Sequence, residues 1–302
     1  MSSWKIGDVR ITRLQEQEPV WPGTMILKEA TEDNVKRKGE WLAPFCKDGN
    51  FRLSIHALLL ESEGRRILVD TCVGNDKIRP GFTEWNQMHL PFLSDLEKVG
   101  VTRDSIDTVV CTHFHIDHVG WNTMLENGKW VPTFPKARLI MVKREWEHWN
   151  KFEGSPDFKN PIDDSVRPII AAGLADLVDA GHRINGEVSL ESTPGHTPGH
   201  TSVRIASRGE NAVITGDMIH HPIQFAHPDW ICEFDNEPSL ASETRRAFVE
   251  RYCDKPVTVL VSCLSNMWGM RAPLTANLSQ RFSAPFGQTR TPTPIDIYET
   301  RH

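Results

Sequence analysis

The feature that most constrains this chain is a run of metal-binding residue types directly after a short apolar segment. Residues 106–111 are rich in β-branched side chains and predict a buried strand. His113, His115, Asp117 and His118 follow within six residues. Side chains two apart in an extended chain point to the same side, so His113 and His115 face together while Asp117 and His118 lie on the next turn. This spacing favours two adjacent metal ions over one.

A single histidine after a strand is usually an ordinary loop residue, and an H-x-H pair can arise by chance. Two later motifs argue against chance here. Residues 193–200, Thr-Pro-Gly-His-Thr-Pro-Gly-His, form a Pro/Gly turn that would hold His196 rigidly. A predicted strand ends at Asp217, in the sequence Ile-Thr-Gly-Asp of residues 214–217. An aspartate at such a position commonly forms a turn. Because Asp217 follows the other two motifs, however, a role as metal ligand is favoured. Imidazole and carboxylate donors indicate zinc, with iron or manganese as alternatives.

Charge and composition limit the kinds of partner that this chain is expected to bind. The 302 residues carry a net charge of −6, which offers no electrostatic footprint for nucleic acid or for an anionic membrane surface. The six cysteines form no C-x-x-C pair, so we expect reduced thiols. No bilayer-length apolar stretch and no signal peptide are recognisable, which predicts a cytoplasmic protein acting on a small-molecule substrate.

The order of predicted elements is strands first, then alternating helices and strands, then strands and a helix. We expect one domain over residues 1–302. Residues 4–14 predict one edge strand, residues 53–70 a hairpin, and residues 160–179 one helical stretch. Residues 16–50 show no clear periodicity and predict a flap or long loop. Residues 264–302 are rich in Pro, Thr and Ser and predict a poorly ordered tail.

The three motifs and their order along the chain resemble those of the metallo-β-lactamase superfamily. The order is H-x-H-x-D-H, then T-P-G-H-T-P-G-H, then T-G-D. The resemblance runs from about residue 53 to 263, and it is strongest to the branch of N-acyl-homoserine lactonases, methyl parathion hydrolase-like and glyoxalase II-like enzymes. It implies an α/β (α+β) fold, a four-layer αββα sandwich with the metal site at one edge of two sheets.

The resemblance also implies a role for each matching residue. His113, His115 and His196 would bind a first metal ion, Asp117 and His118 a second, and Asp217 would bridge the two. Asp70 would support the site, and His200 would be structural.

The implied reaction is hydrolysis by a metal-bound hydroxide, with two zinc ions expected. Asp117 would be catalytic, either orienting the hydroxide or carrying its proton to the leaving group. We expect a lactone or other ester as substrate, before a phosphotriester. A homodimer is expected only by analogy with this branch.

One departure from the family pattern stands out. The family supplies a further histidine after the last core strand, here residues 257–261, yet no histidine follows until His302. Either the second metal site is weakened, or another side chain substitutes, the candidates being Cys263, His220, His221 and His227. A shifted reading frame or divergent C-terminus after Val261 is a third explanation. The alternative functions are accordingly a mono-iron oxygenase of the persulfide dioxygenase type and a catalytically impaired homologue.

Two aromatic-rich regions are candidates to cover the site, although core packing is the commoner role for such side chains. Their large apolar residues are Trp21, Trp41, Phe45, Trp85 and Met88. Residues 220–230 follow Asp217 and are equally consistent with a surface loop and with a substrate-contacting segment.

Overall fold

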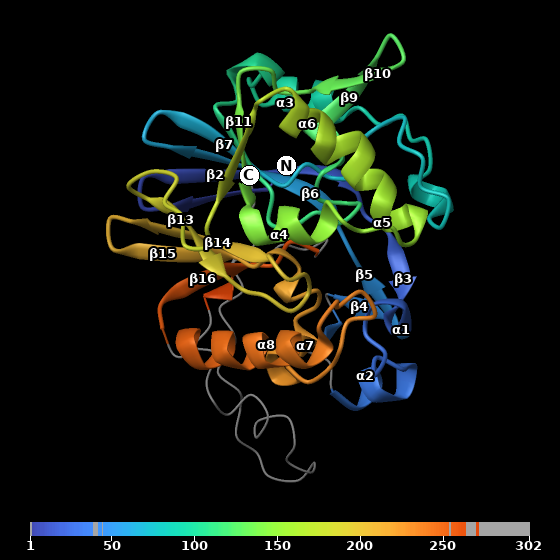
Figure 1. Cartoon of the computed structure of the whole chain (residues 1–302). Coiled ribbons are helices and arrows are strands. Elements are labelled where there is room, and N and C mark those ends of the chain that lie inside the picture. The colour runs from blue at the N-terminus through green and yellow to red at the C-terminus, as the bar shows by residue number, and fades with distance from the viewer. Residues whose placement is uncertain (1, 39–41, 44, 254, 264–269, 272–302) are drawn as a thin grey trace.

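The computed structural model describes residues 2–38, 42–43, 45–253, 255–263 and 270–271. Two sheets dominate this part of the chain (Figure 1). The larger has seven strands in the order β1-β2-β6-β7-β8-β11-β12. Their bounds are Ser3–Ile6, Val9–Gln17, Ile55–Ser62, Arg65–Val69, Thr108–Val110, Arg138–Val142 and Ala175–Val178.

The first strand of the larger sheet differs from the prediction. Residues 4–14 form two antiparallel strands, β1 and β2, rather than one. The turn between them places Gly7 at a φ of 58°, where glycine is favoured. A side chain at Gly7 would also collide with the Ser207 carbonyl, 2.3 Å from an added Cβ. The prediction of a hairpin over residues 53–70 is confirmed by β6 and β7.

The smaller sheet has the order β13-β14-β15-β16-β17. Its strands are Val188–Ser192, Thr201–Ser207, Glu210–Ile214, Val257–Leu260 and Met270–Arg271. Strand β17 pairs antiparallel with β16 and lies inside the region 264–302, so two residues of the predicted tail belong to a sheet. The rest of that region lies outside the described residues.

The two sheets face each other across an apolar layer. From the larger sheet it takes Ile11, Leu60 and Val69, and from the smaller Val203 and Ile214, all 2% exposed or less. Alternate side chains of a strand point to opposite faces, so each sheet presents a second face that needs its own cover. Burial of apolar surface on both faces stabilises the sandwich by about 25 cal/mol per Å².

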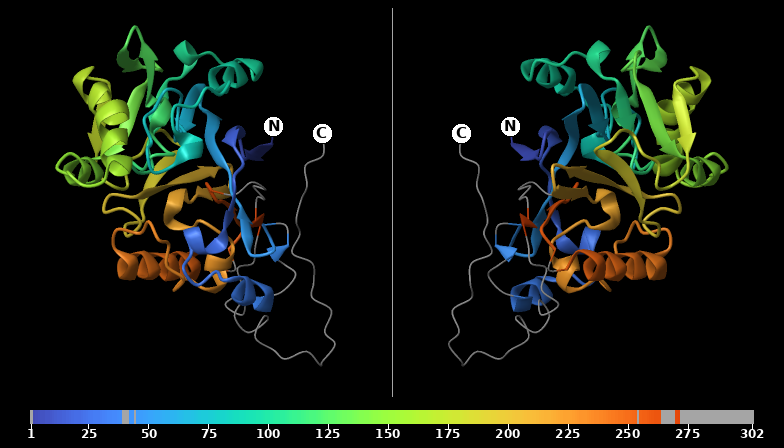
Figure 2. Two further views of the ribbon diagram at one scale, coloured as in Figure 1. Left: turned by 90° about the vertical axis from the view of Figure 1, so that its right-hand side faces the viewer. Right: turned by 90° about the vertical axis from the view of Figure 1, so that its left-hand side faces the viewer.

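Helices cover the two outer faces. Helix α8 (Pro238–Tyr252) lies under the smaller sheet in Figure 1, and its Phe248 and Tyr252 pack with Val213 and Val259. Helices α3 (Phe92–Lys98), α4 (Lys143–Trp149), α5 (Pro156–Pro161) and α6 (Arg167–Ala171) flank the larger sheet, as Figures 1 and 2 show from three sides. The layers therefore run helix, sheet, sheet, helix, and the predicted αββα sandwich is confirmed.

Residues 160–179 are not one helical stretch as predicted. Helix α5 continues through a π-helical turn, Ile162–Val166, into α6, and the chain then enters β12. Pro161 and Pro168 each lack the N–H that a regular ladder requires, so the hydrogen bonding is irregular here. Gly173, at a φ of 69°, ends the helix and allows β12 to pair with β11.

The described residues of the segment 16–50 contain short helices and strands, whereas a long irregular loop was predicted. They contain the end of β2 and the short elements β3 (Val20–Pro22), α1 (Gly23–Ile26), α2 (Glu32–Lys38) and β4 (Cys46–Lys47), and they lead into β5 (Asn50–Arg52). The three strands pair in the order β3-β5-β4. Elements of two to seven residues are too short to show a periodicity, which is why the sequence pattern missed them.

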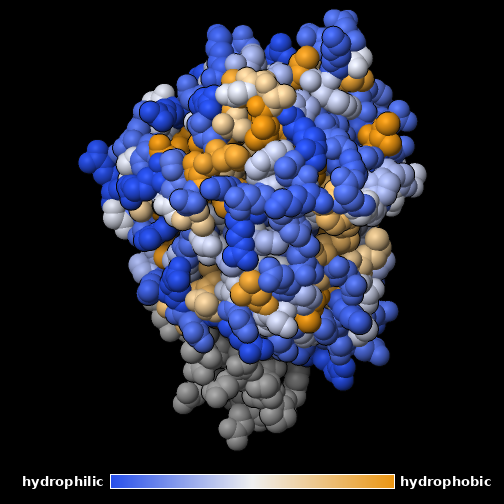
Figure 3. All heavy atoms as spheres, viewed as in Figure 1, coloured by the Kyte–Doolittle hydropathy of each residue, from blue (hydrophilic) through white to orange (hydrophobic). Residues whose placement is uncertain are grey.

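The remaining elements are short. They are the hairpin β9 (Thr123–Glu126) and β10 (Lys129–Pro132), helix α7 (Ile223–Ala226), and single turns at Thr83–Trp85, Arg103–Ser105, Gly120–Asn122 and Gly216–Met218. In the described part of the chain, no helix is both long and apolar enough to cross a bilayer. The face in Figure 3 is mainly hydrophilic, with small separate apolar areas.

Candidate metal centre

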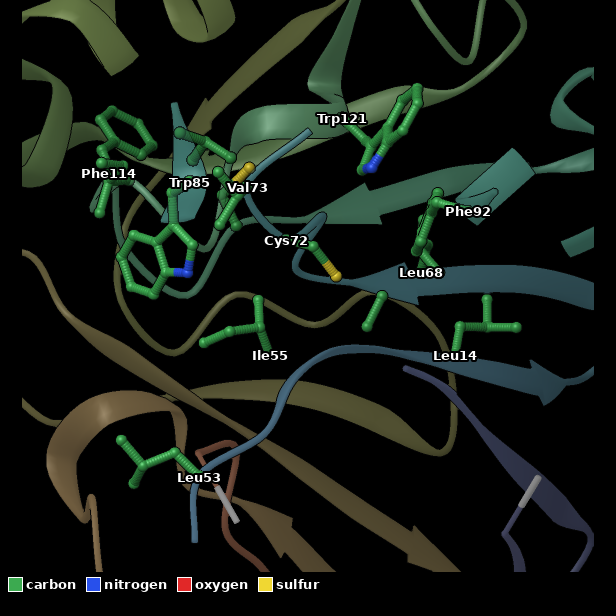
Figure 4. Close-up of a cluster of buried hydrophobic side chains, with 14 of the residues drawn as sticks. Leu14, Leu53, Ile55, Leu68, Cys72, Val73, Trp85, Phe92, Phe114 and Trp121 are labelled. Carbon is green, nitrogen blue, oxygen red and sulfur yellow. The ribbon is translucent and has the colours of Figure 1, made fainter. Parts of the chain in front are cut away.

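Every predicted metal ligand follows a strand of one of the two sheets. His113, His115, Asp117 and His118 come after β8 of the larger sheet. In the smaller sheet, His196 lies between β13 and β14, and Asp217 follows β15. The side chain of Phe114, between the first two histidines, belongs to the buried apolar cluster of Figure 4 and anchors that loop to the core. The six predicted residues thus meet at one edge of the sandwich.

The first group consists of His113, His115 and His196, whose ligand atoms all lie within 4.8 Å of one another. His196 Nδ1 donates to Asp235 Oδ1 at 3.0 Å, so its Nε2 presents a lone pair. That Nε2 lies 2.9 Å from His115 Nδ1. His113 Nε2 is buried and has no hydrogen-bond partner in the described structure. Imidazole nitrogens converging in this way fit a shared divalent cation.

The second group forms around the other side of Asp217. His118 Nε2 lies 3.2 Å from Asp217 Oδ1 and 3.6 Å from Asp117 Oδ2. His118 Nδ1 is 2.8 Å from Asp70 Oδ2, which leaves Nε2 to face the two carboxylates. Asp217 Oδ2 faces the first group, 3.7 Å from His196 Nε2 and 3.9 Å from His113 Nε2. One carboxylate therefore lies between two donor groups, an arrangement that fits a pair of ions.

Burial and neighbouring charges set the protonation of these groups. Burial lowers the pKa of His113 and of His115 well below the usual histidine value, so both are neutral and able to coordinate. Although burial opposes it, the carboxylates of Asp217, Asp117 and Asp70 raise the pKa of His118 well above its usual range. Burial raises the pKa of Asp117 to about 6. This excess of carboxylates around His118 favours a cation beside it.

Two residues with predicted supporting roles make the expected contacts. Asp70 follows β7, and its Oδ1 accepts from the Thr112 backbone N–H at 2.8 Å, next to His113. His200 Nε2 accepts from the Asp217 backbone N–H at 2.9 Å, and its Nδ1 contacts Thr193 Oγ1 at 2.8 Å. Because both of its ring nitrogens are engaged, His200 orients Asp217 and has no free nitrogen for a metal ion.

Asp235 is a site residue that the sequence analysis missed. It orients His196, and Arg245 Nη1 donates to its other oxygen at 3.2 Å. Arg245 also donates to the carbonyls of Pro228 and Trp230, and neither charged side chain is exposed. No motif marks Asp235, because its partners lie 39 and 10 residues away. Only the folded chain brings them together.

Glu145 on α4 is the second missed residue. Its Oε1 accepts from the Phe114 backbone N–H at 3.1 Å and from Trp149 Nε1 at 2.7 Å, and its Oε2 accepts from the Gly199 N–H at 2.8 Å. This one carboxylate joins the H-x-H loop to the second histidine loop. Gly199 is needed for the approach, since a Cβ there would lie 2.3 Å from the Glu145 nitrogen.

A partly open pocket lies over the candidate metal-binding residues. His115, Asp117, His196 and Asp217 are part of its lining, with His220 and Cys263 beside them. Its walls are apolar, and include Trp21, Ile26, Phe82, Trp85, Phe158 and Phe234. Ile55 and Trp85, both labelled in Figure 4, connect this wall to the core.

Of the side chains predicted to cover the site, Trp21 and Trp85 do line the pocket. Phe45 and Met88 are buried in the core instead, and Trp41 lies outside the described residues. Within residues 220–230, His220 lines the pocket, while Trp230 is buried against His227.

Comparison with known proteins agrees with this geometry. Residues 51–250 match the family model of the metallo-beta-lactamase superfamily. An N-acyl homoserine lactonase of a Bacillus species is 26% identical over 206 residues, covering 64% of this chain and 75% of the lactonase. Among solved structures, the hydrolase AbOPH of the beta lactamase superfamily superposes with a TM-score of 0.72 at 26% identity, covering 87% of this chain and 90% of AbOPH.

AidC, a dizinc quorum-quenching lactonase in complex with a product, superposes with a TM-score of 0.70 at 23% identity, covering 88% of this chain and 90% of AidC. This second superposition supports the fold. The family match covers well over half of the sequence and spans all six predicted ligands. The chain therefore belongs to the metallo-beta-lactamase superfamily and is a metallo-hydrolase of that family.

Proposed function

We propose that this hydrolase cleaves a lactone or other carboxylic ester, with two zinc ions held by His113, His115 and His196 on one side and by Asp117 and His118 on the other, bridged by Asp217. The observation that carries the proposal is an apolar pocket whose base is formed by the metal-binding residues. No Lys or Arg lines this pocket among the described residues. Such a wall suits an uncharged substrate with a sizeable apolar part. The similarity to N-acyl homoserine lactonases supports the same substrate class.

Zinc ions bound here would lower the pKa of a coordinated water and polarise the scissile carbonyl. The chain's own residues would do the rest. Asp235 holds the His196 ring and Asp70 holds the His118 ring, which keeps both lone pairs directed inward. Asp117 lines the pocket with its side chain 14% exposed, where its carboxylate is placed to take the proton of the attacking water and deliver it to the leaving alkoxide. The aromatic wall would shield one side of the ester from bulk water.

The test is metal content by elemental mass spectrometry on protein purified without chelator, followed by assays on the same sample. The substrates are an N-acyl homoserine lactone, an aryl ester and a phosphotriester. We expect about two zinc ions per chain and turnover of the lactone or the ester. A matched pair is His113→Asn, which should lose the first ion and turnover, and His182→Asn, outside the pocket lining and the donor groups, which should lose neither.

Other outcomes would contradict the proposal in different ways. A fully zinc-loaded protein that leaves all three substrates intact would refute the hydrolytic assignment. One iron per chain with oxygen uptake on a persulfide would identify the mono-iron oxygenase. Very little metal together with no turnover would identify the impaired homologue.

A further inference from the structure

The chain lacks the histidine expected after the last core strand, and four described side chains are candidates to replace it. The rings of two of them stack on aromatic side chains outside the pocket lining. The ring of His221 stacks on Phe51 at a centroid distance of 3.8 Å, and that of His227 stacks on Trp230 at 5.2 Å. Neither His221 nor His227 lines the pocket, whereas His220 and Cys263 both do.

His220 and Cys263 approach Asp217 from opposite sides. His220 Nε2 lies 3.3 Å from Asp217 Oδ2, the oxygen that faces His113 and His196. Cys263 Sγ lies 3.0 Å from Asp217 Oδ1, the oxygen that faces His118. Since each carboxylate oxygen faces one donor group, His220 belongs beside the first group and Cys263 beside the second.

We propose that Cys263, as a thiolate, completes the second metal site together with Asp117, His118 and Asp217. This inference rests on the metal centre of the proposed function but not on the substrate. His118 Nε2 supplies a second observation: its side chain is 5% exposed, and this nitrogen has no hydrogen-bond partner in the described structure. It points to the same oxygen of Asp217 as the Cys263 thiol does.

Three separations between neighbouring atoms of this set fit donors that share one ion. Two ligand atoms of a tetrahedral zinc ion lie roughly 3–4 Å apart. Asp217 Oδ1 lies 3.0 Å from Cys263 Sγ and 3.2 Å from His118 Nε2, and His118 Nε2 lies 3.6 Å from Asp117 Oδ2, all within this range. On coordination the Cys263 S–H bond breaks, the sulfur keeps the electron pair and binds the ion, and the proton leaves to solvent. A mixed O, N and S shell also favours zinc, cobalt or cadmium over manganese.

The chain contains a competing thiol that makes the proposal easy to test. Cys232 Sγ lies 3.5 Å from His220 Nε2, and Cys232, His220 and His196 form a third group of donors. Both cysteines are buried and reduced, and both lie near Asp217 or its neighbours. Cys232 is on the side of the first metal group, so it should not contribute to the second site.

The experiment is cobalt substitution of the metal-free full-length protein, read by near-ultraviolet thiolate-to-cobalt charge-transfer absorption and by bound cobalt per chain. We expect the wild type to show the band as the second equivalent binds. Cys263→Ser should lose the band and bind the second ion at least about tenfold more weakly. Cys263→His should bind two cobalt ions tightly but show no band. Cys232→Ser should bind two cobalt ions and also keep the band.

A charge-transfer band that persists in Cys263→Ser, or that disappears in Cys232→Ser, would overturn the proposal, as would two cobalt ions bound to the wild type with no band. Far-ultraviolet circular dichroism of each variant checks that it is folded, and Cys263→His keeps the test decisive if Cys263→Ser does not fold. A band assigned to Cys263 in a protein that hydrolyses none of the tested substrates would leave this ligand assignment standing and refute the proposed reaction.

Discussion

At the scale of single residues, the candidate metal ligands are held in place by three carboxylates outside the two donor groups. Asp70, Glu145 and Asp235 each hydrogen-bond to a ligand loop or a ligand ring. A ring fixed through one nitrogen directs the lone pair of the other, and this orientation is worth about 10- to 100-fold in metal affinity. Glu145 is the most informative of the three, because it joins two loops that come from different sheets.

We predict that Glu145→Gln weakens metal binding by about 10- to 100-fold and the folded state by about 1–3 kcal/mol. The amide NH2 must take the place of one oxygen, so either the Gly199 N–H or the Phe114 and Trp149 N–H groups lose their acceptor. Isothermal titration with zinc and urea unfolding measure the two effects.

The control is Glu147→Gln on the same helix, where the side chain is 56% exposed. It changes the same charge without touching either loop, and it should leave both measurements unchanged. Equal behaviour of the two variants would show that Glu145 has no positioning role.

The six candidate ligands could be identified from the sequence because they stand in three local motifs, each after a strand. Asp235 and Glu145 could not, since their importance arises from contacts 39 and 54 residues away. The choice among four substitutes for the absent histidine also had to wait for the structure. It depends on which oxygen of Asp217 each side chain faces, and spacing along the chain does not determine that.

At the scale of elements, Trp21 and Ile26 bring the segment 16–50 into the wall of the pocket over the candidate metal centre. Strand β3 carries Trp21, whose ring lies 5.2 Å from that of Trp85 and 6.4 Å from that of Phe82. These rings come from two segments far apart in the sequence, and together they form an apolar wall over the metal-binding residues. The wall is therefore where chain-length preference for an acyl group would arise.

We predict that Trp21→Leu raises KM for a long-chain acyl lactone or ester by about tenfold, which corresponds to about 1.4 kcal/mol, because part of the apolar wall is removed. A short-chain ester should show little change, and kcat should be nearly constant for both. Steady-state kinetics over a series of acyl lengths measure this. Trp130→Leu in the β9–β10 hairpin, outside the pocket, is the control; an equal loss for short and long chains would contradict the role of Trp21.

The apolar runs over residues 53–70 predicted the hairpin of β6 and β7 well. Predictions failed where a single residue changes the course of the chain. Gly7 divides one expected strand into two, and Gly173 ends a helix and begins β12. A periodicity averaged over many residues does not register such local turns.

At the scale of the whole molecule, the metal centre joins the two sheets at their edge. One set of ligands follows β8 of the larger sheet, and the other follows strands of the smaller sheet. An ion that binds only the assembled sandwich stabilises it over the unfolded chain.

We predict that removing the metal with a chelator lowers the thermal unfolding midpoint by roughly 5 °C or more, since an ion at 100 times its Kd contributes about 2.7 kcal/mol. Adding zinc back should restore the midpoint, and magnesium should not, because it disfavours imidazole. Scanning calorimetry measures both. His113→Asn removes a ligand of the first ion only, so the same treatment should shift its midpoint less; a chelator effect of equal size in that variant would place the stabilising ion elsewhere.

The division of ligands between the sheets also has a consequence for the order of events in folding. Neither half of the sequence holds a complete site, because His113 and His115 need His196, and His118 needs Asp217. A metal ion can therefore bind tightly only after the larger and the smaller sheet have docked. If a light-absorbing ion such as cobalt is present during refolding, the rise of its absorbance would thus report the time at which the two sheets dock. During synthesis, a nascent chain would first retain its metal only after the second half of the sequence has been made.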